Sequence, residues 1–160
     1  MTSGSIGKTK GIRESVKIGG VDLFHNTWTV RSDLAGNVYR VWDDEGGKNV
    51  TWSPNPSTRA LSWMQASFPT PPLTSSQALV FNATGLGRGH FFVNGVDLGR
   101  YWTIPRAKSN PPTPTQQLYP IPTDVLHPTK STQQNRIVVI EIIGATNPTL
   151  PAIQTISLQK

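Results

Sequence analysis

The sequence predicts an all-β fold, an antiparallel β-sandwich of jelly-roll type. Short runs of β-branched and aromatic residues recur between turn signals along the 160-residue chain, and no run has the period of an amphipathic helix. Glycine and proline occur 14 times each, which favours many short strands joined by turns. Because this length suits one domain, we predict a single sandwich over residues 12–160 after a loose lead-in at residues 1–11.

Several short strands are expected in the first half of the chain. Gly19-Gly20 predicts a turn between the alternating run 13–18 and residues 21–24, which together form a hairpin. Further strands are predicted at 28–30, 39–42 and 60–68, which are rich in aromatic and β-branched residues. The polar, proline-interrupted stretch at 43–59 is predicted to be a surface loop.

A hairpin centred on Asn94-Gly95 is the strongest local signal. Apolar runs flank the dipeptide on both sides, and Asn-Gly suits a type I′ turn because both of its central residues need positive φ. A strand at 78–81 precedes the hairpin. Between them come three glycines that predict a bend or a close approach of two backbones: Gly85, Gly87 and Gly89.

The C-terminal part completes the predicted sheets. Residues 103–117 are polar and rich in proline, which predicts a long loop. The prolines at 118–122 restrict that run to a sheet edge or a loop. The run RIVVIEII at 136–143 is almost continuous in apolar residues and predicts the most buried strand. Residues 153–158 alternate again and are expected to close the sheet.

The central hairpin resembles the C-terminal β-sandwich segment of β-galactosidases of glycoside hydrolase family 35. That family's hallmark runs G-x-G-x-x-x-V-N-G-x-x-x-G-R-Y-W. This chain matches it at Gly87, Gly89, Val93, Asn94, Gly95, Gly99, Arg100, Tyr101 and Trp102. The resemblance implies a galactose-binding-like sandwich. In this family the catalytic glutamates lie in a separate (β/α)₈ barrel, which nothing in this chain matches.

A non-catalytic domain is therefore expected. Glycosidase chemistry needs two carboxylates across a sugar-sized gap. The three glutamates, Glu14, Glu45 and Glu141, fall in turns and in the predicted buried strand, and the sequence places no pair together. The Gly-rich stretch 85–89 opens a strand rather than a helix, which excludes a dinucleotide-binding loop.

Composition limits the classes of partner and cofactor that we expect for this chain. The net charge of +6 comes from basic residues scattered along the chain, so nucleic acid is not an expected partner. Cysteine is absent, which excludes disulfides and thiol ligands, and no cofactor is expected. Asp43, Asp44 and Glu45 form a weak candidate for a structural calcium site, although a solvated turn is the favoured interpretation.

Targeting signals are sparse. No apolar run approaches the length of a membrane span, and the first residues lack the apolar core of a signal peptide. Sequons beginning at Asn49 and Asn82 would permit N-glycosylation in a secretory or lysosomal context, so the compartment stays open.

Sugar recognition needs an aromatic face for the C–H side of a pyranose and planar polar groups for its hydroxyls. Six residues supply these types and are our candidates for sugar binding: Trp28, Trp52, Arg88, His90, Asn94 and Trp102. Trp63 lies inside a predicted strand, and we expect it in the core. We predict a carbohydrate-binding module of galactoside type. The alternative is a structural accessory domain that packs on a glycosidase catalytic barrel and has no ligand of its own.

Arg100 and Glu141 are expected to form a structural ion pair. A carboxylate in the 136–143 strand is costly to bury unless it is paired. The resembled family keeps both the arginine and the glutamate, which implies that they are partners.

Overall fold

The computed structural model describes residues 15–29, 33–105, 114, 116–148 and 152–158. Contacts divide the chain into two compact units, Met1–Asp33 and Leu34–Lys160. The sandwich therefore belongs to a unit that starts at Leu34, later than the predicted boundary at residue 12. Every described residue from 15 to 29 except Val16 and Leu23 is exposed, so this first stretch adds little to a core.

The first unit holds the predicted Gly-Gly hairpin. Strands β1 (Lys17–Ile18) and β2 (Val21–Asp22) pair in antiparallel fashion across Gly19-Gly20. Both glycines have positive φ, 58° and 85°, which explains why glycine occupies these two positions. Trp28 and Thr29 are not in a strand, contrary to prediction, and Val30 lies outside the described residues.

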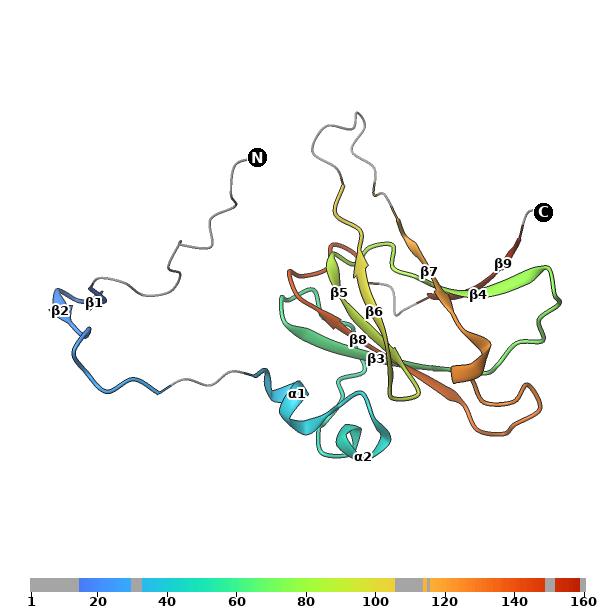
Figure 1. The fold of residues 1–160 in the computed structure, drawn as a ribbon, viewed down its shortest axis with the longest axis horizontal. Helices are drawn as coiled ribbons and strands as arrows, with labels where there is room; N and C mark the ends of the chain where they lie inside the picture. Colours follow the sequence, from blue (N-terminus) through green and yellow to red (C-terminus); the bar gives the residue numbers. More distant parts are fainter. Residues whose placement is uncertain (1–14, 30–32, 106–113, 115, 149–151, 159–160) are drawn as a thin grey trace, which may run out of the picture. The chain divides into compact units, whose positions relative to one another are not determined.

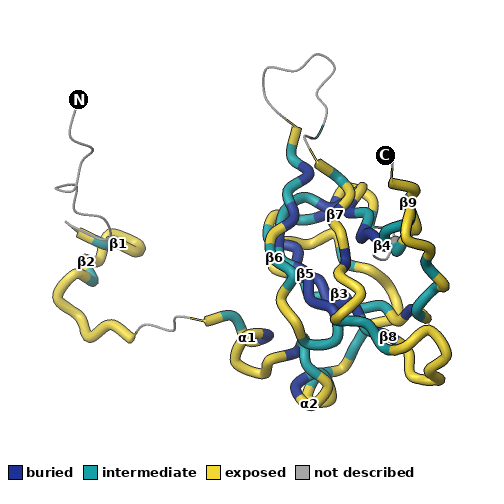
Figure 2. Tube along the Cα trace, turned by 45° about the vertical axis from the view of Figure 1, so that its right-hand side comes forward, coloured by how far each residue is buried: buried dark blue, intermediate teal, exposed yellow. Residues whose placement is uncertain are grey.

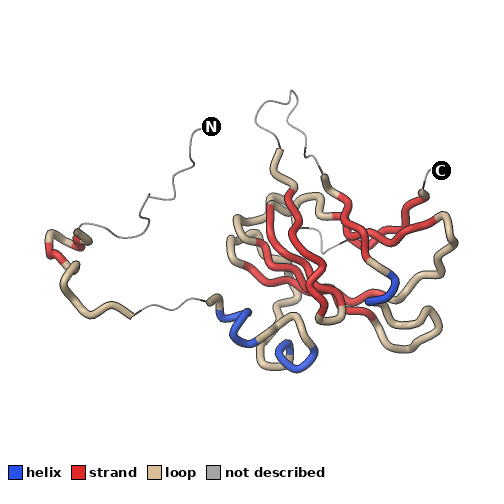
Figure 3. Tube along the Cα trace, in the orientation of Figure 1, coloured by secondary structure: helices blue, strands red, loops and turns tan. Residues whose placement is uncertain are grey.

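The second unit is an antiparallel β-sandwich, as the sequence predicts (Figures 1 and 3). A four-stranded sheet has the order β3 (Ser62–Phe68), β8 (Asn135–Glu141), β5 (Arg88–Val93) and β6 (Val96–Trp102). A three-stranded sheet has the order β7 (Leu118–Ile121), β4 (Gln77–Asn82) and β9 (Ala152–Ser157). All neighbouring strands pair in antiparallel fashion.

The core fills the space between the two sheets with aromatic and aliphatic side chains. Its aromatic centre is formed by Phe81, Phe91, Tyr101 and Tyr119, whose ring centroids lie 5.0 to 6.4 Å apart in the contacting pairs. Strand β8 lies between β3 and β5, and residues 137–139 of β8 have no exposed surface (Figure 2). This confirms the prediction that the RIVVIEII run is the most buried strand. Strand β7, which carries Pro120, lies at a sheet edge, also as predicted.

The segment before β3 is helical in part, which corrects the strand predicted at 39–42. Helix α1 (Ala35–Tyr39) ends at Arg40, which has a left-handed φ of 52°, and helix α2 (Asp44–Gly47) follows a turn. The aromatic composition of this segment reflects packing rather than strand pairing. Trp42 stacks on Phe92, with 4.9 Å between the ring centroids.

Trp63 also differs from expectation. Its ring lies 5.8 Å from that of Trp42 and 6.1 Å from that of Phe92, and Phe92 lies opposite Val138 on β8. Since Met64, its neighbour on β3, belongs to the core between the sheets, strand alternation places Trp63 on the outer face of the four-stranded sheet. The side chain is half-buried there rather than in the core. A short 3₁₀ helix, η1 (Thr123–Val125), completes the helical elements, and no described helix is long and apolar enough to cross a membrane.

Candidate functional site

The Asn94-Gly95 turn has the predicted geometry and joins three parts of the domain. Asn94 and Gly95 have φ values of 48° and 84°. The Asn94 amide donates to the Val125 carbonyl at 2.8 Å and to Asn135 Oδ1 at 2.9 Å, and its oxygen accepts from the Arg136 backbone N–H. Because the protein itself uses both amide atoms of Asn94, we assign this sugar-binding candidate a structural role.

Glu141, at the end of β8, is a buried carboxylate with five hydrogen-bond donors. It has no exposed surface. Four donors are backbone N–H groups and the fifth is a phenol: Gly87 at 2.7 Å, Arg88 at 3.3 Å, Ile143 at 3.0 Å, Gly144 at 3.1 Å and the Tyr101 hydroxyl at 2.9 Å. Burial and the adjacent Glu141 charge raise the pKa of Tyr101 well above its usual range. The hydroxyl therefore stays a donor to Glu141.

Arg100 is not the partner of Glu141, which corrects the predicted ion pair. Tyr101 and Glu141 both align with Gly89 in the sheet, whereas Arg100 aligns with His90. Neighbouring residues on a strand point to opposite faces, so the core-facing side chain is Tyr101 and not Arg100. Arg100 is exposed, and its guanidinium lies 5.2 Å from the centroid of the Trp102 ring.

The acidic stretch at the start of α2 has three separate roles. Asp43 accepts from the Gly46 N–H at 2.6 Å and pairs with Arg40. Asp44 pairs with Arg136 at 3.4 Å, and Glu45 pairs with Lys48 at 2.6 Å. No group of three or more potential metal ligands occurs among the residues that the structure describes. The cluster thus caps a helix and forms ion pairs.

Three further sugar-binding candidates each have local contacts of their own. Trp28 belongs to the first unit, is half exposed and donates its indole N–H to the Leu23 carbonyl. Trp52 donates to the Gly47 carbonyl and lines a small cavity of about 90 Å³ together with Trp63. His90 lies 3.4 Å from Asp97 on the surface of the β5–β6 hairpin.

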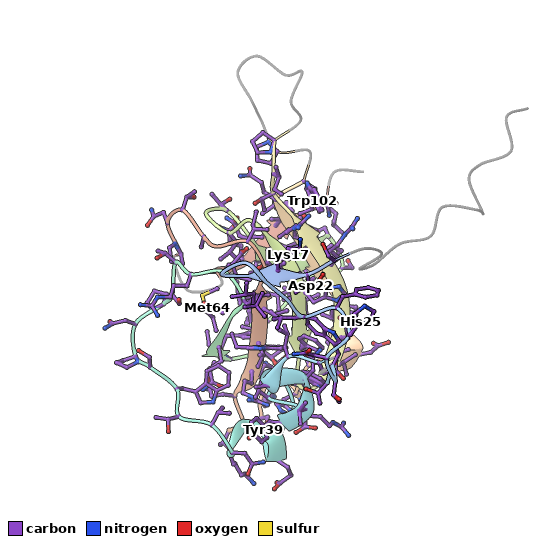
Figure 4. The ribbon with its side chains drawn as sticks, turned by 90° about the vertical axis from the view of Figure 1, so that its left-hand side faces the viewer. Lys17, Asp22, His25, Tyr39, Met64 and Trp102 are labelled. Atoms are coloured by element: carbon purple, nitrogen blue, oxygen red, sulfur yellow. The ribbon has the colours of Figure 1, made fainter. Side chains whose placement is uncertain are left out.

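Arg88 and Trp102 do come together, and Arg100 joins them. Arg88 and Trp102 are opposite each other in the β5–β6 register, and the Arg88 guanidinium lies 5.2 Å from the Trp102 ring centroid. Trp102 is the last residue of β6 and is labelled in the upper part of Figure 4. The two guanidinium groups and the indole form a basic-aromatic cluster on one face of the hairpin.

This cluster borders a surface cavity at the facing edges of the two sheets, which we call the β6–β7 hollow. It has a volume of about 440 Å³ and is lined by Arg100, Trp102, Gln116 and Tyr119. The Tyr119 hydroxyl accepts from the Trp102 N–H at 2.7 Å and donates to the Trp102 carbonyl at 3.1 Å. The sequence did not indicate Gln116 or Tyr119, because only the tertiary fold brings the start of β7 to the end of β6.

Comparison with known proteins agrees with this architecture. Residues 61–131 match the family described as the galactose-binding domain of β-galactosidase. The chain carries a β-galactosidase galactose-binding domain. Within this domain lie β3 to η1, and with them every residue of the β6–β7 hollow, whereas Trp28, Trp52 and both α-helices lie outside the matched range.

Relatives of the galactose-binding domain and its flanks are found among plant enzymes. The chain is 32% identical over 138 residues to β-galactosidase 7 of Oryza sativa subsp. japonica, covering 85% of this chain and 17% of that protein. It is 33% identical over 114 residues to β-galactosidase 11 of the same species, covering 71% and 13%. It is 32% identical over 127 residues to β-galactosidase 14 of Arabidopsis thaliana, covering 79% and 14%. The chain thus spans less than a fifth of the length of these relatives.

Proposed function

We propose that this domain is a non-catalytic carbohydrate-binding module that binds galactosides in the β6–β7 hollow. The observation that carries the proposal is the hollow itself, which combines an indole ring with side-chain hydrogen-bond donors inside the matched domain. A concave site of this kind suits a sugar better than a flat apolar surface would.

Each lining side chain has a role that sugar recognition requires. The Trp102 indole offers apolar surface to the C–H groups of a pyranose. The Arg100 guanidinium and the Gln116 amide, both on exposed residues, supply N–H donors for hydroxyl oxygens, and the amide oxygen of Gln116 accepts from a hydroxyl. Tyr119 is buried beneath them and fixes the backbone of Trp102 through its hydroxyl. Four lining residues suit a weak interaction, with a Kd of about 1 mM, near −4 kcal/mol.

The carboxylates support a non-catalytic role. None of the described lining residues of the hollow is acidic. The carboxylate of Glu141 is buried with five donors, and Asp97 contacts His90 and accepts from the Gly99 N–H. Among the described residues around this site, no two carboxylates face one sugar as glycoside hydrolysis requires.

The accessory role remains the second candidate, and one observation favours it. The first unit exposes Ile18 by 67%, Val21 by 62% and Trp28 by 50%. Exposed apolar side chains gathered in one short segment are typical of a surface that another protein covers. A catalytic barrel of the kind implied by the family resemblance is the partner that this alternative requires.

A titration followed by NMR chemical shifts tests the galactoside proposal. Galactose, lactose and methyl β-galactoside should shift the Trp102 indole and Gln116 amide signals saturably, whereas glucose and mannose should not. Trp102→Ala should abolish binding, because it removes the aromatic surface. Trp28→Ala is the matched control, since Trp28 lies in the first unit, and should bind normally.

The opposite results are equally informative. Unchanged galactoside binding by the Trp102→Ala variant would remove the site from the β6–β7 hollow. If none of the sugars caused saturable shifts, the proposed sugar binding would be overturned and the accessory role would be left.

A further inference from the structure

We propose that the β6–β7 hollow prefers galacturonic acid and its glycosides over neutral galactosides. Arg88 and Arg100 would bind the carboxylate of the uronic acid beside the Trp102 ring. This inference rests on the proposed sugar-binding function and adds the charge of the ligand to it. It is carried by the basic-aromatic cluster of Arg88, Arg100 and Trp102.

The two guanidinium groups are held on the same side of the hairpin. Arg88 lies opposite Trp102 across the β5–β6 ladder, and Arg100 precedes Trp102 by two residues on β6, so all three side chains leave the same face. Each guanidinium carbon lies 5.2 Å from the indole centroid, within the range of a cation–π contact. The indole thereby restricts both side chains before any ligand arrives.

Neither arginine has a carboxylate partner among the residues that the structure describes. The ion pairs found there join Arg40 to Asp43, Lys48 to Glu45, His90 to Asp97 and Arg136 to Asp44. The Nε atom of Arg88 is buried and has no hydrogen-bond partner. A buried N–H without an acceptor costs free energy, so the described protein groups do not fully satisfy the Arg88 guanidinium.

Neither Glu141 nor Asp97 forms an ion pair with the arginines of the cluster. Glu141 accepts hydrogen bonds from the backbone N–H of Gly87 and Arg88, and it points to the core face together with Tyr101. Asp97 lies beside His90 and accepts from the Gly99 N–H. Among the described residues, Arg100 in the hollow and Arg88 beside the Trp102 ring are therefore left without an ion-pair partner, in a chain whose net charge is already +6.

A uronic acid fits this arrangement chemically. Galacturonic acid has the ring of galactose with a carboxylate at C6, so the hollow can hold its hydroxyls while the carboxylate reaches the arginines. Guanidinium groups bind carboxylates through two parallel N–H···O bonds, which are stronger than bonds between neutral groups. Because the indole already orders the two side chains, less conformational entropy is lost on binding.

Calorimetric titration of the full chain tests this inference with three probes: galacturonic acid, methyl β-galactoside and acetate. At low ionic strength we expect galacturonic acid to bind about tenfold more tightly than methyl β-galactoside, and acetate to bind more weakly than either. In about 1 M salt, where the Debye length is about 3 Å, the ratio of the two sugar affinities should fall toward about two.

Charge-removing variants locate the effect. Arg88→Gln and Arg100→Gln should each lower the galacturonic acid to galactoside affinity ratio by about threefold or more. Arg59→Gln removes the same charge from an exposed loop residue and should leave the ratio unchanged. Two different arginines are used so that a folding defect in one variant does not decide the result.

The failures of the two proposals differ. Equal affinity for both sugars would overturn the acidic preference and leave galactoside binding intact. No binding of either sugar would overturn the proposed function itself. Acetate binding as tightly as galacturonic acid, or a ratio unchanged in both arginine variants, would also overturn this inference.

Discussion

Gly89 determines which side chain can reach Glu141. A Cβ atom at this position would lie 1.7 Å from the Ile140 carbonyl oxygen and 2.8 Å from the Tyr101 hydroxyl. Since Tyr101, Gly89 and Glu141 align across three strands, the missing side chain leaves the space through which the phenol contacts the carboxylate. One residue without a side chain thus permits the polar contact that this part of the core contains.

Glu141→Gln should lower the free energy of unfolding by about 3 kcal/mol, measured by urea denaturation. The substitution replaces one acceptor oxygen of a fully buried side chain by an NH₂ group that faces N–H and O–H donors. Arg100→Ala is the variant to compare. An ion pair between Arg100 and Glu141 would predict a similar loss in the free energy of unfolding for this variant. The observed contact of Arg100 with Trp102 predicts a loss below about 1 kcal/mol. Equal losses in the two variants would contradict the assignment of Tyr101 as the partner.

Part of this site could be predicted from the sequence. The sequence indicated that a buried glutamate at 141 needs partners, and the structure provides five. It did not identify them, because adjacent residues such as Arg100 and Tyr101 point to opposite faces, and the facing direction depends on the register with β5. Four of the five donors are backbone N–H groups. Because every residue except proline has such a group, the residue type does not indicate which ones bind the carboxylate.

At the scale of elements, local signals were the most predictable. Asn94-Gly95 specified its own turn because the positive φ values that it needs are properties of two adjacent residues. Residues 39–42 were wrongly predicted as a strand, because the aromatic Trp42 packs on a ring that is 50 positions away along the chain. Composition alone does not distinguish a strand from a segment that covers a sheet.

Asn94→Ala should destabilise the domain by about 3 kcal/mol. The variant loses three hydrogen bonds to η1 and β8 and places a residue that disfavours left-handed φ in the turn. Asn55→Ala, at an exposed loop position, is the control and should change stability by less than about 0.5 kcal/mol. Thermal unfolding monitored by circular dichroism measures both. A neutral Asn94→Ala variant would show that the hairpin tip contributes little to the fold.

At the scale of the whole molecule, the domain class could be predicted but its starting point could not. The predicted sandwich starts at residue 12 and includes the Gly-Gly hairpin, whereas the compact unit of the sandwich starts at Leu34. Among the described residues, the hydrophobic core cluster and the side chains packed against it run from Met64 to Ile153. A domain boundary depends on which side chains are buried together. The alternation of apolar and polar residues in the short Gly-Gly hairpin does not show whether its side chains join the core.

A chain shortened to residues 34–160 should therefore fold on its own. We expect its Tm to lie within about 3 °C of that of the full chain and its unfolding to stay cooperative, because the core is retained. Differential scanning calorimetry of the two proteins makes the comparison. A broad transition or a large fall in Tm would show that the first 33 residues contribute to the core.

The bond between Tyr119 and Trp102 also affects how the molecule could join to another strand. Strands β6 and β7 are both edge strands, and open edges invite backbone pairing with a second chain. At Trp102 the phenol of Tyr119 occupies both backbone groups, accepting from the N–H and donating to the carbonyl, much as a neighbouring strand would. A side chain thus takes the place of a strand at the end of β6. A partner strand that added along β6 would therefore find the backbone groups of Trp102 already bonded, whereas β3 forms the opposite edge of the same sheet.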